Sequence, residues 1–313
     1  MTTTADHPTT ADATTSEADA ELARRALRLE GPLRDALASV LDAAESIAER
    51  SASSPRWEVS DANALRSLVH QVFEDSVAEF FTAEATSTVL PHELRDRVEP
   101  NPLAAPLPDP DDALDVDFLD VLDARRSERS FANRPISLRE LSTLLHHAVG
   151  MRTTEAGYGV RGLPLFRFPT IGGLCGLRFD VVATNVEGLA RGRYRYDPVG
   201  HGLEVVELGD HRAALVDSTF ETDWIFHAPV VVACIVEQTR TSWKYKTRSY
   251  RFSHVDLGAA VQNLALTTAA LDLAGCPVAA FFDAAANEAL HLASPDEYLG
   301  LLFAIGHEPR PGR

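Results

Sequence analysis

The sequence predicts an α+β fold, in which a sheet packs on one long central helix. Helical and strand patterns alternate in the second half of the chain, but several strands follow one another as hairpin-like neighbours. Residues 254–275 form a long helical pattern that is apolar on most faces, as expected for a central helix. With 313 residues, of which 45% are hydrophobic, the chain can bury a sizeable core in one large domain or two modest ones.

Composition narrows the class of protein. The apolar run at 230–236 is typical of the longest ones and falls well short of the ~18 residues of a membrane span. The first twenty residues lack the basic and apolar regions of a secretory signal. The three cysteines are far apart and odd in number, which does not fit a disulfide framework. We therefore expect a cytoplasmic protein with no membrane partner, and the net charge of −17 argues against nucleic acid.

The acidic residues are concentrated in the N-terminal part. Residues 1–122 hold 25 Asp and Glu against nine Arg, so nearly all of the net charge lies there. This asymmetry suggests two regions with different roles, the first meeting a basic partner or simply aiding solubility. We predict a disordered tail over 1–17, then a region over 18–115 with helices at 18–50 and 61–82. It ends in a Pro-rich stretch, 85–114, that is either a linker or an extended wrap over the surface.

The larger domain is predicted over 116–313. The segment 118–131 is predicted as a short helix that leads into a basic turn, and a second helix, ending at Gly150, begins with a capping box of Ser137 and Glu140. Residues 151–177 are glycine-rich and are predicted as a long loop. The remaining expected elements are strands at 177–186, 192–198, 202–208, 228–237, 276–283 and 299–306 and helices at 211–219, 254–275 and 285–292.

Two segments have the residue types of a binding site for an anionic, flat ligand. Arg125, Arg126 and Arg129, with the hydroxyl of Ser127, form a cluster of donors suited to phosphate, or else a solvated turn. The loop 167–176 contains three glycines, which let backbone N–H groups approach a ligand closely, although a plain turn before a strand has the same composition.

A third segment concerns proton transfer. The chain has only two lysines, Lys244 and Lys246, and they flank Tyr245. A cation beside a phenol lowers the pKa of the phenol, so Tyr245 is a candidate base or acid; the alternative is a solvated turn. A metal site is not expected, because the adjacent His146 and His147 lack the spacing of four that places two ligands on one helix face. Nucleotide-binding glycine motifs are also absent from the sequence.

Six segments in order resemble the nitroreductase superfamily, and more narrowly its SagB-type dehydrogenases. They are RRSERSF at 125–131, LSTLLHHAVG at 141–150, the loop RFPTIGG at 167–173, GRYRYDP at 192–198, the segment from Lys244 to Leu266, and the closing strand with Gly306. The resemblance covers roughly residues 117–308. It implies the α+β nitroreductase sandwich and FMN bound at a homodimer interface, with both chains contributing to each site.

The resemblance also assigns roles to residues. It implies that Arg125, Arg126, Ser127 and Arg129 lie near the FMN phosphate, and that Pro169, Thr170 and Gly172 lie along the flavin. It places Gln262 and Asn263 on the central helix, near the cofactor or the dimer interface. In the azoline oxidases of this group a Lys-Tyr pair is catalytic, and Lys244 and Tyr245 match it.

At two positions the sequence differs from the family pattern, and these differences affect the expected substrate. Cys175 stands where the family loop usually has an aromatic residue, and Ala259 stands where a histidine is common. The expected function is oxidation of thiazoline or oxazoline rings in a ribosomally made peptide, with a cyclodehydratase as a possible partner. One alternative is an NAD(P)H-dependent FMN reductase of nitro, quinone or dehydroamino-acid substrates. Another is a flavin-free scaffold that binds a peptide or a partner.

Overall fold

The computed structural model describes residues 89–112, 114–220, 222–294 and 296–309. Its centre is a seven-stranded sheet with the order β1-β6-β5-β4-β7-β9-β8, in which every neighbouring pair is antiparallel. The strands are β1 (Ala105–Pro106), β4 (Leu177–Ala183), β5 (Gly192–Asp197), β6 (Gly202–Leu208), β7 (Val230–Glu237), β8 (Ala274–Val278) and β9 (Glu297–Gly306). The predicted α+β class, with a sheet packed against helices, is confirmed.

Helices cover both faces of this sheet. They are α4 (Phe118–Ala124), α5 (Leu138–Val149), α6 (Arg212–Asp217), α7 (Thr239–Tyr245), α8 (Arg248–Ala270) and α9 (Asp283–Ala289), with short 3-10 turns η2 (His92–Arg97), η3 (Ile171–Gly173) and η4 (Asp223–His227). Strand β7 is buried along its whole length, and its side chains alternate between two cores. Val232 and Cys234 belong to the core under α5 and α8, whereas Val231 and Ala233 belong to the core under α6 and α9.

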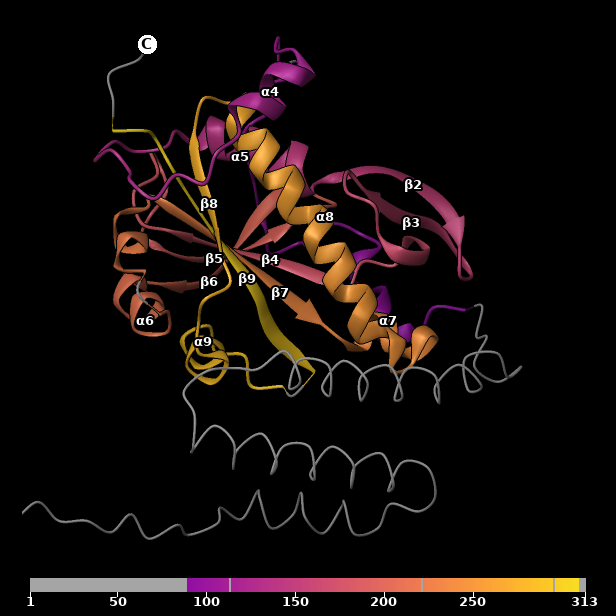
Figure 1. Ribbon diagram of the computed structural model, residues 1–313. Helices are drawn as coiled ribbons and strands as arrows, with labels where there is room; N and C mark the ends of the chain where they lie inside the picture. Colours follow the sequence, from indigo (N-terminus) through magenta and orange to yellow (C-terminus); the bar gives the residue numbers. More distant parts are fainter. Residues whose placement is uncertain (1–88, 113, 221, 295, 310–313) are drawn as a thin grey trace, which may run out of the picture. The chain divides into compact units, whose positions relative to one another are not determined.

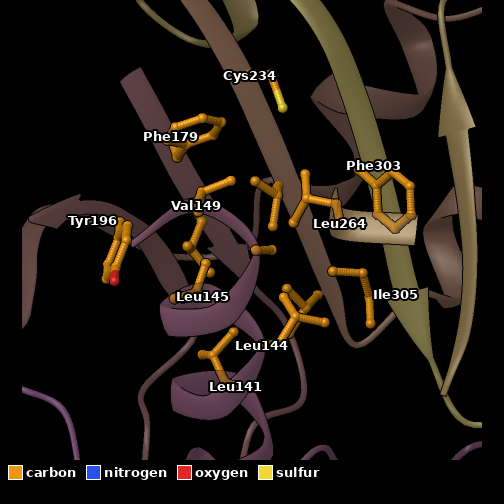
Figure 2. Close-up of a cluster of buried hydrophobic side chains, with 14 of the residues drawn as sticks. Leu141, Leu144, Leu145, Val149, Phe179, Tyr196, Cys234, Leu264, Phe303 and Ile305 are labelled. Atoms are coloured by element: carbon orange, nitrogen blue, oxygen red, sulfur yellow. The ribbon is translucent and has the colours of Figure 1, made fainter. Parts of the chain in front are cut away.

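Helix α5 is the base of the first core. Leu141, Leu144 and Leu145 point from α5 toward the sheet and toward Leu264 of α8 (Figure 2). The predicted capping box is present: the Ser137 hydroxyl accepts from the backbone N–H of Glu140, and the Glu140 carboxylate accepts from the backbone N–H of Ser137. The helix ends at Val149, one residue before the predicted end at Gly150, so local sequence signals predict this element to within one residue.

Helix α8 crosses the sheet from α7 at one end to α4 at the other (Figure 1). It begins six residues before the predicted start and ends at Ala270. One face, including Leu257, Ala260 and Leu264, is buried against the sheet. Val255 and Gln262 lie on the opposite, exposed face, so the residues that the structure describes cover this helix on one side only.

The prediction of one long loop over 151–177 is wrong for its first part, which forms two strands. Residues Met151–Gly157 (β2) and Val160–Phe166 (β3) form an antiparallel hairpin, separate from the main sheet. Its two-residue turn has positive φ at both positions, 51° at Tyr158 and 72° at Gly159, which matches the twist of a hairpin. A tyrosine in this conformation is uncommon. The turn therefore lacks the Asn-Gly or Asp-Gly sequence that usually predicts a two-residue hairpin turn.

The described part of the Pro-rich stretch, from residue 89 to residue 112, runs over the surface of the domain as a wrap. At its start, the backbone N–H of Leu90 donates to the carbonyl of Tyr158 at the hairpin turn, 2.7 Å away. Farther along, Arg97 pairs with Glu237 at the end of β7, and β1 then extends the sheet beside β6. The predicted tail at 1–17 and the predicted helices at 18–50 and 61–82 lie outside the described residues. No helix in the described ranges is long and apolar enough to cross a membrane.

Candidate active site

The glycine loop reverses direction at η3, between β3 and β4. Gly172 has φ of 66°, and a Cβ at this position would overlap the hydroxyl of Tyr245. Glycine is therefore required twice, for the left-handed backbone and for the close approach of the phenol. The loop is also tied to α8, because the backbone N–H of Ile171 donates to the Asp256 carboxylate at 3.1 Å. Pro169 is exposed and Thr170 half-buried beside this turn.

The last turn of α7 carries Lys244 and Tyr245 to this loop. Lys244 is half-buried, and its Nζ donates a hydrogen bond to the hydroxyl of Tyr158. The same Nζ lies 4.1 Å from the ring centroid of Tyr158 and 5.1 Å from that of Tyr245. Lys246 is exposed in the break between α7 and α8, so the two lysines have different surroundings. The structure thus brings Lys244, Tyr245 and Gly172 together, and adds Tyr158 to them.

The expected lowering of the Tyr245 pKa by Lys244 is wrong. Burial raises the pKa of Tyr245. The charge of the neighbouring Tyr158 and a side-chain hydrogen bond with it raise this pKa further, as does the charge of Asp256. The side chain is only 6% exposed, so an ionised phenol is poorly solvated there. Tyr245 is consequently a protonated phenol in the resting protein.

Asp256 and Tyr158 are site residues that the sequence reasoning did not select. Burial raises the pKa of the Asp256 carboxyl to about 7, although the hydrogen bond from Ile171 opposes the shift. The sequence offered one signal for Asp256, its place in the Asp-Leu-Gly run of the family motif. It offered none for Tyr158, because only the hairpin brings this residue, 86 positions away in the chain, to Lys244.

The arginine cluster lies in the extended segment after α4. A cavity of about 860 Å³ adjoins it and is lined by Arg126, Arg134, His307 and several acidic residues, among them Asp272. Its size is ordinary for a small-molecule site. Arg126 lies 3.7 Å from Glu128, and both side chains are partly exposed, so this pair leaves the guanidinium accessible.

The other members of the cluster are also placed to donate. The guanidinium of Arg129 donates to the carbonyl of Ser127 at 3.3 Å. Within the described part of the chain, Arg125 and Arg129 take part in no ion pair with a carboxylate. Accessible guanidinium groups next to a hydroxyl fit a phosphate, because they supply charge-assisted and bidentate donors.

Gln262 and Asn263 point in different directions from α8. Asn263 donates from its side-chain amide to the carbonyls of Ala148 and Arg167, both 3.2 Å away, and so joins α8 to the end of α5 and to the start of the glycine loop. Gln262 is exposed on the uncovered face of the helix. Asn263 therefore has a structural role in this chain, whereas Gln262 is free to meet a ligand or a second chain.

The two parts of the predicted flavin site lie against different parts of α8. The glycine loop contacts the helix at Asp256 and, through the carbonyl of Arg167, at Asn263. The cavity beside the arginine cluster is lined by Thr268 near the end of the helix. Twelve residues of helix, or about 18 Å, separate Asp256 from Thr268.

Comparison with known proteins identifies the family. The model of the nitroreductase family matches residues 122–307, more than half of the chain. The chain belongs to the nitroreductase family. A candidate nitroreductase of Methanocaldococcus jannaschii is 32% identical to this nitroreductase-family protein over 200 residues, which cover 63% of this chain and 94% of the relative. The protein is accordingly an oxidoreductase, from a family whose members typically depend on a flavin.

Solved structures share the fold of this nitroreductase-family protein. A candidate nitroreductase from Ralstonia eutropha superposes with a TM-score of 0.55 at 24% identity, over 68% of this chain and 95% of that one. The Escherichia coli microcin synthetase complex McbBCD, with truncated pro-MccB17 bound, has a chain that superposes with a TM-score of 0.50 at 16% identity, over 76% and 92%. A longer chain from Anabaena variabilis matches with a TM-score of 0.50 at 22% identity, and the alignment spans only 38% of it.

Proposed function

We propose that the protein is an FMN-dependent dehydrogenase that oxidises thiazoline or oxazoline rings in a ribosomally synthesised peptide. The observation that carries this proposal is the meeting of Lys244 and Tyr245 with Gly172, the residue that the family resemblance assigns to the flavin. The Lys-Tyr pair distinguishes azoline oxidases within the resemblance. A chain of the microcin synthetase complex, which binds a peptide precursor, has the same fold and supports a peptide substrate and a cyclodehydratase partner.

The cofactor assignment rests on the donors of the arginine cluster. Arg125, Arg126, Ser127 and Arg129 would hold the phosphate, while Pro169, Thr170 and Gly172 would lie along the ring system. Since these groups lie against different parts of α8, we propose that each site is shared by two copies of the chain. The exposed face of α8, with Val255 and Gln262, is the surface that a symmetric partner would cover.

The proposed reaction removes two hydrogens from the azoline ring, one as a proton and one as a hydride. FMN, when bound, supplies the two-electron acceptor, and dioxygen is the proposed final oxidant. The proton requires a group of the protein within hydrogen-bond reach of the ring. Tyr245, with Lys244 beside it, is the proposed group. Its phenol must first release its proton to solvent, and the ammonium of Lys244 stabilises the phenolate that results. The phenolate then takes the ring proton, which restores the phenol.

The first experiment is an absorbance spectrum of the purified protein, with release of any chromophore, followed by turnover of an azoline-containing peptide. Flavin bands and released FMN support the proposal, and a colourless protein that takes up no FMN refutes it and favours the scaffold alternative. Tyr245→Phe is expected to lower kcat by about 10²- to 10⁴-fold while FMN stays bound. Full turnover by Tyr245→Phe would remove Tyr245 from the mechanism.

A reductase is the second candidate function, and the 32% identity to a candidate nitroreductase favours it. In that case NAD(P)H would reduce the bound flavin, which would then reduce a nitro, quinone or dehydroamino-acid substrate. Mixing the protein with NADPH in the absence of oxygen separates the two functions. Rapid loss of the flavin absorbance at the rate of turnover supports the reductase, and slow loss together with azoline oxidation supports the dehydrogenase.

A further inference from the structure

We propose that Tyr158, at the turn of the β2–β3 hairpin, is the positioning residue for Lys244 in the active site. The proposal rests on the proposed function, because it assumes that Lys244 acts in the reaction. It begins from the phenol of Tyr158, which accepts a hydrogen bond from Lys244 and donates one to the carbonyl of Gly172 at 2.7 Å. One hydroxyl therefore connects the ammonium of α7 to the glycine loop.

The position of the Lys244 ammonium must be fixed by contacts with its neighbours. A lysine side chain has four rotatable bonds along its carbon chain, and fixing it costs conformational entropy that these contacts must offset. Tyr158 offers two contacts, because Nζ also lies 4.1 Å from the centroid of its ring, within the range of a cation–π interaction. The ring of Tyr158 is in turn held edge-on against Trp243, with centroids 5.8 Å apart.

The hairpin turn is itself fixed, so that Tyr158 is a rigid partner. Its carbonyl accepts the backbone N–H of Leu90 in the wrap, and Val89 packs against Gly159. Leu90 is 5% exposed and shares a small core with Tyr245 and Leu163 of the hairpin. The wrap, the hairpin and α7, three separate parts of the sequence, thus meet around Tyr158 and Tyr245.

The phenols of Tyr158 and Tyr245 differ in burial. It is half-buried, whereas Tyr245 is buried and linked to Tyr158 by a side-chain hydrogen bond. Tyr158 thus lies between Lys244 and Tyr245 in one hydrogen-bonded group. Loss of its hydroxyl keeps the aromatic ring beside the ammonium but removes the hydrogen bond that fixes Nζ, so turnover is expected to be affected more than substrate binding.

The test is a double-mutant cycle of Tyr158→Phe and Lys244→Met on azoline oxidation. Tyr158→Phe is expected to lower kcat by about 10- to 100-fold, the range of one hydrogen bond to a charged group, with KM nearly unchanged and FMN retained. In the Lys244→Met background the same change is expected to cost less than about twofold, because residues that act as one unit are not additive. Tyr250→Phe, an exposed tyrosine of α8, is the matched control and is expected to be neutral.

A second measurement does not depend on turnover. Since Lys244 and Lys246 are the only lysines, protein labelled with ¹⁵N-lysine gives at most two side-chain ammonium signals. Tyr158→Phe is expected to shift the Lys244 signal and speed its hydrogen exchange, while the Lys246 signal stays as an internal control. If wild-type protein oxidises no azoline but the signal shifts, the proposed function is wrong and the Tyr158–Lys244 contact holds.

Two results would overturn the inference. One is wild-type kcat in Tyr158→Phe; the other is an equal loss with and without Lys244, which means a general structural effect. If Tyr158→Phe does not accumulate as folded protein, Tyr158→Asn replaces it, because asparagine accepts a positive φ and also lacks the phenol. The same fall in kcat and the same shift of the ammonium signal are expected of it, and their absence would refute the proposal.

Discussion

At the scale of single residues, the candidate site is dominated by burial. Tyr245 and Asp256 are both acids that burial keeps protonated to higher pH than usual, and both lie around the glycine loop. A cation next to a phenol in sequence, as Lys244 is to Tyr245, does not decide the pKa of that phenol. Desolvation acts on every buried group, whereas the benefit of a charge depends on where its atoms lie.

Asp256 gives the protein a defined dependence of stability on pH. The pKa of Asp256 is about 7 in the folded protein, against 3.8 for an aspartate in water, so between these values the folded state binds more protons than the unfolded state. Stability from this group is therefore present below pH 4, falls as the pH rises, and is lost above pH 7. Asp256→Asn keeps an oxygen to accept the N–H of Ile171 and removes the titration.

Thermal unfolding measured from pH 4 to pH 8 tests this expectation. Asp256→Asn is expected to have a higher Tm than wild type at pH 8 and a similar Tm near pH 4. Asp217→Asn, at an exposed aspartate of α6, serves as the control and should follow the wild-type curve. Parallel curves for wild type and Asp256→Asn would mean that Asp256 is ionised in the folded protein at neutral pH.

At the scale of elements, α5 is a helix whose start and core-facing side are determined by its local sequence. The side chain of Ser137 accepts a backbone N–H that would otherwise lack a partner at the helix start, and the Glu140 side chain accepts the backbone N–H of Ser137. The apolar residues that follow are spaced to face the sheet. The hairpin β2–β3 is the opposite case, because its turn uses a tyrosine at positive φ and is held by Leu90 of the wrap.

Removal of the cap gives a measurable loss. Ser137→Ala is expected to lower the free energy of unfolding by about 1 kcal/mol, which corresponds to a fall in Tm of roughly 2–4 °C for a domain of this size. Ser137→Asp keeps a side-chain acceptor at the same position and is expected to retain most of the stability. Equal losses in the two variants would show that the hydroxyl acts through another contact.

At the scale of the whole molecule, the main consequence is the division of the site along α8. The helix contacts the glycine loop at Asp256 and Asn263 and lines the cavity beside the arginine cluster at Thr268. A symmetric pair of chains, with their helices antiparallel, would place the end of one beside the start of the other. The proposed homodimer is one arrangement that would bring the two parts of the proposed flavin site together.

Mixed dimers test this arrangement. Arg126→Glu is expected to abolish the phosphate site and Gly172→Val the loop side, so each variant alone should be inactive. Co-expressed, the two variants are expected to form mixed dimers with one intact site, and to recover up to about half of the wild-type activity per mixed dimer. No recovery, with mixed dimers shown by two affinity tags, would mean that each site is formed within one chain.

The sequence by itself determined the family, the fold class and most elements of the domain. The order of its motifs, the capping box at Ser137 and the apolar strand at 230–237 are local patterns, and each depends on residues within a few positions of one another. Only the tertiary structure decided that Tyr158 meets Lys244, that Asp256 is buried beside the glycine loop, and that the cavity beside the arginine cluster lies against a later part of α8 than Asp256. These relations join residues tens of positions apart, and packing, not local pattern, brings them together.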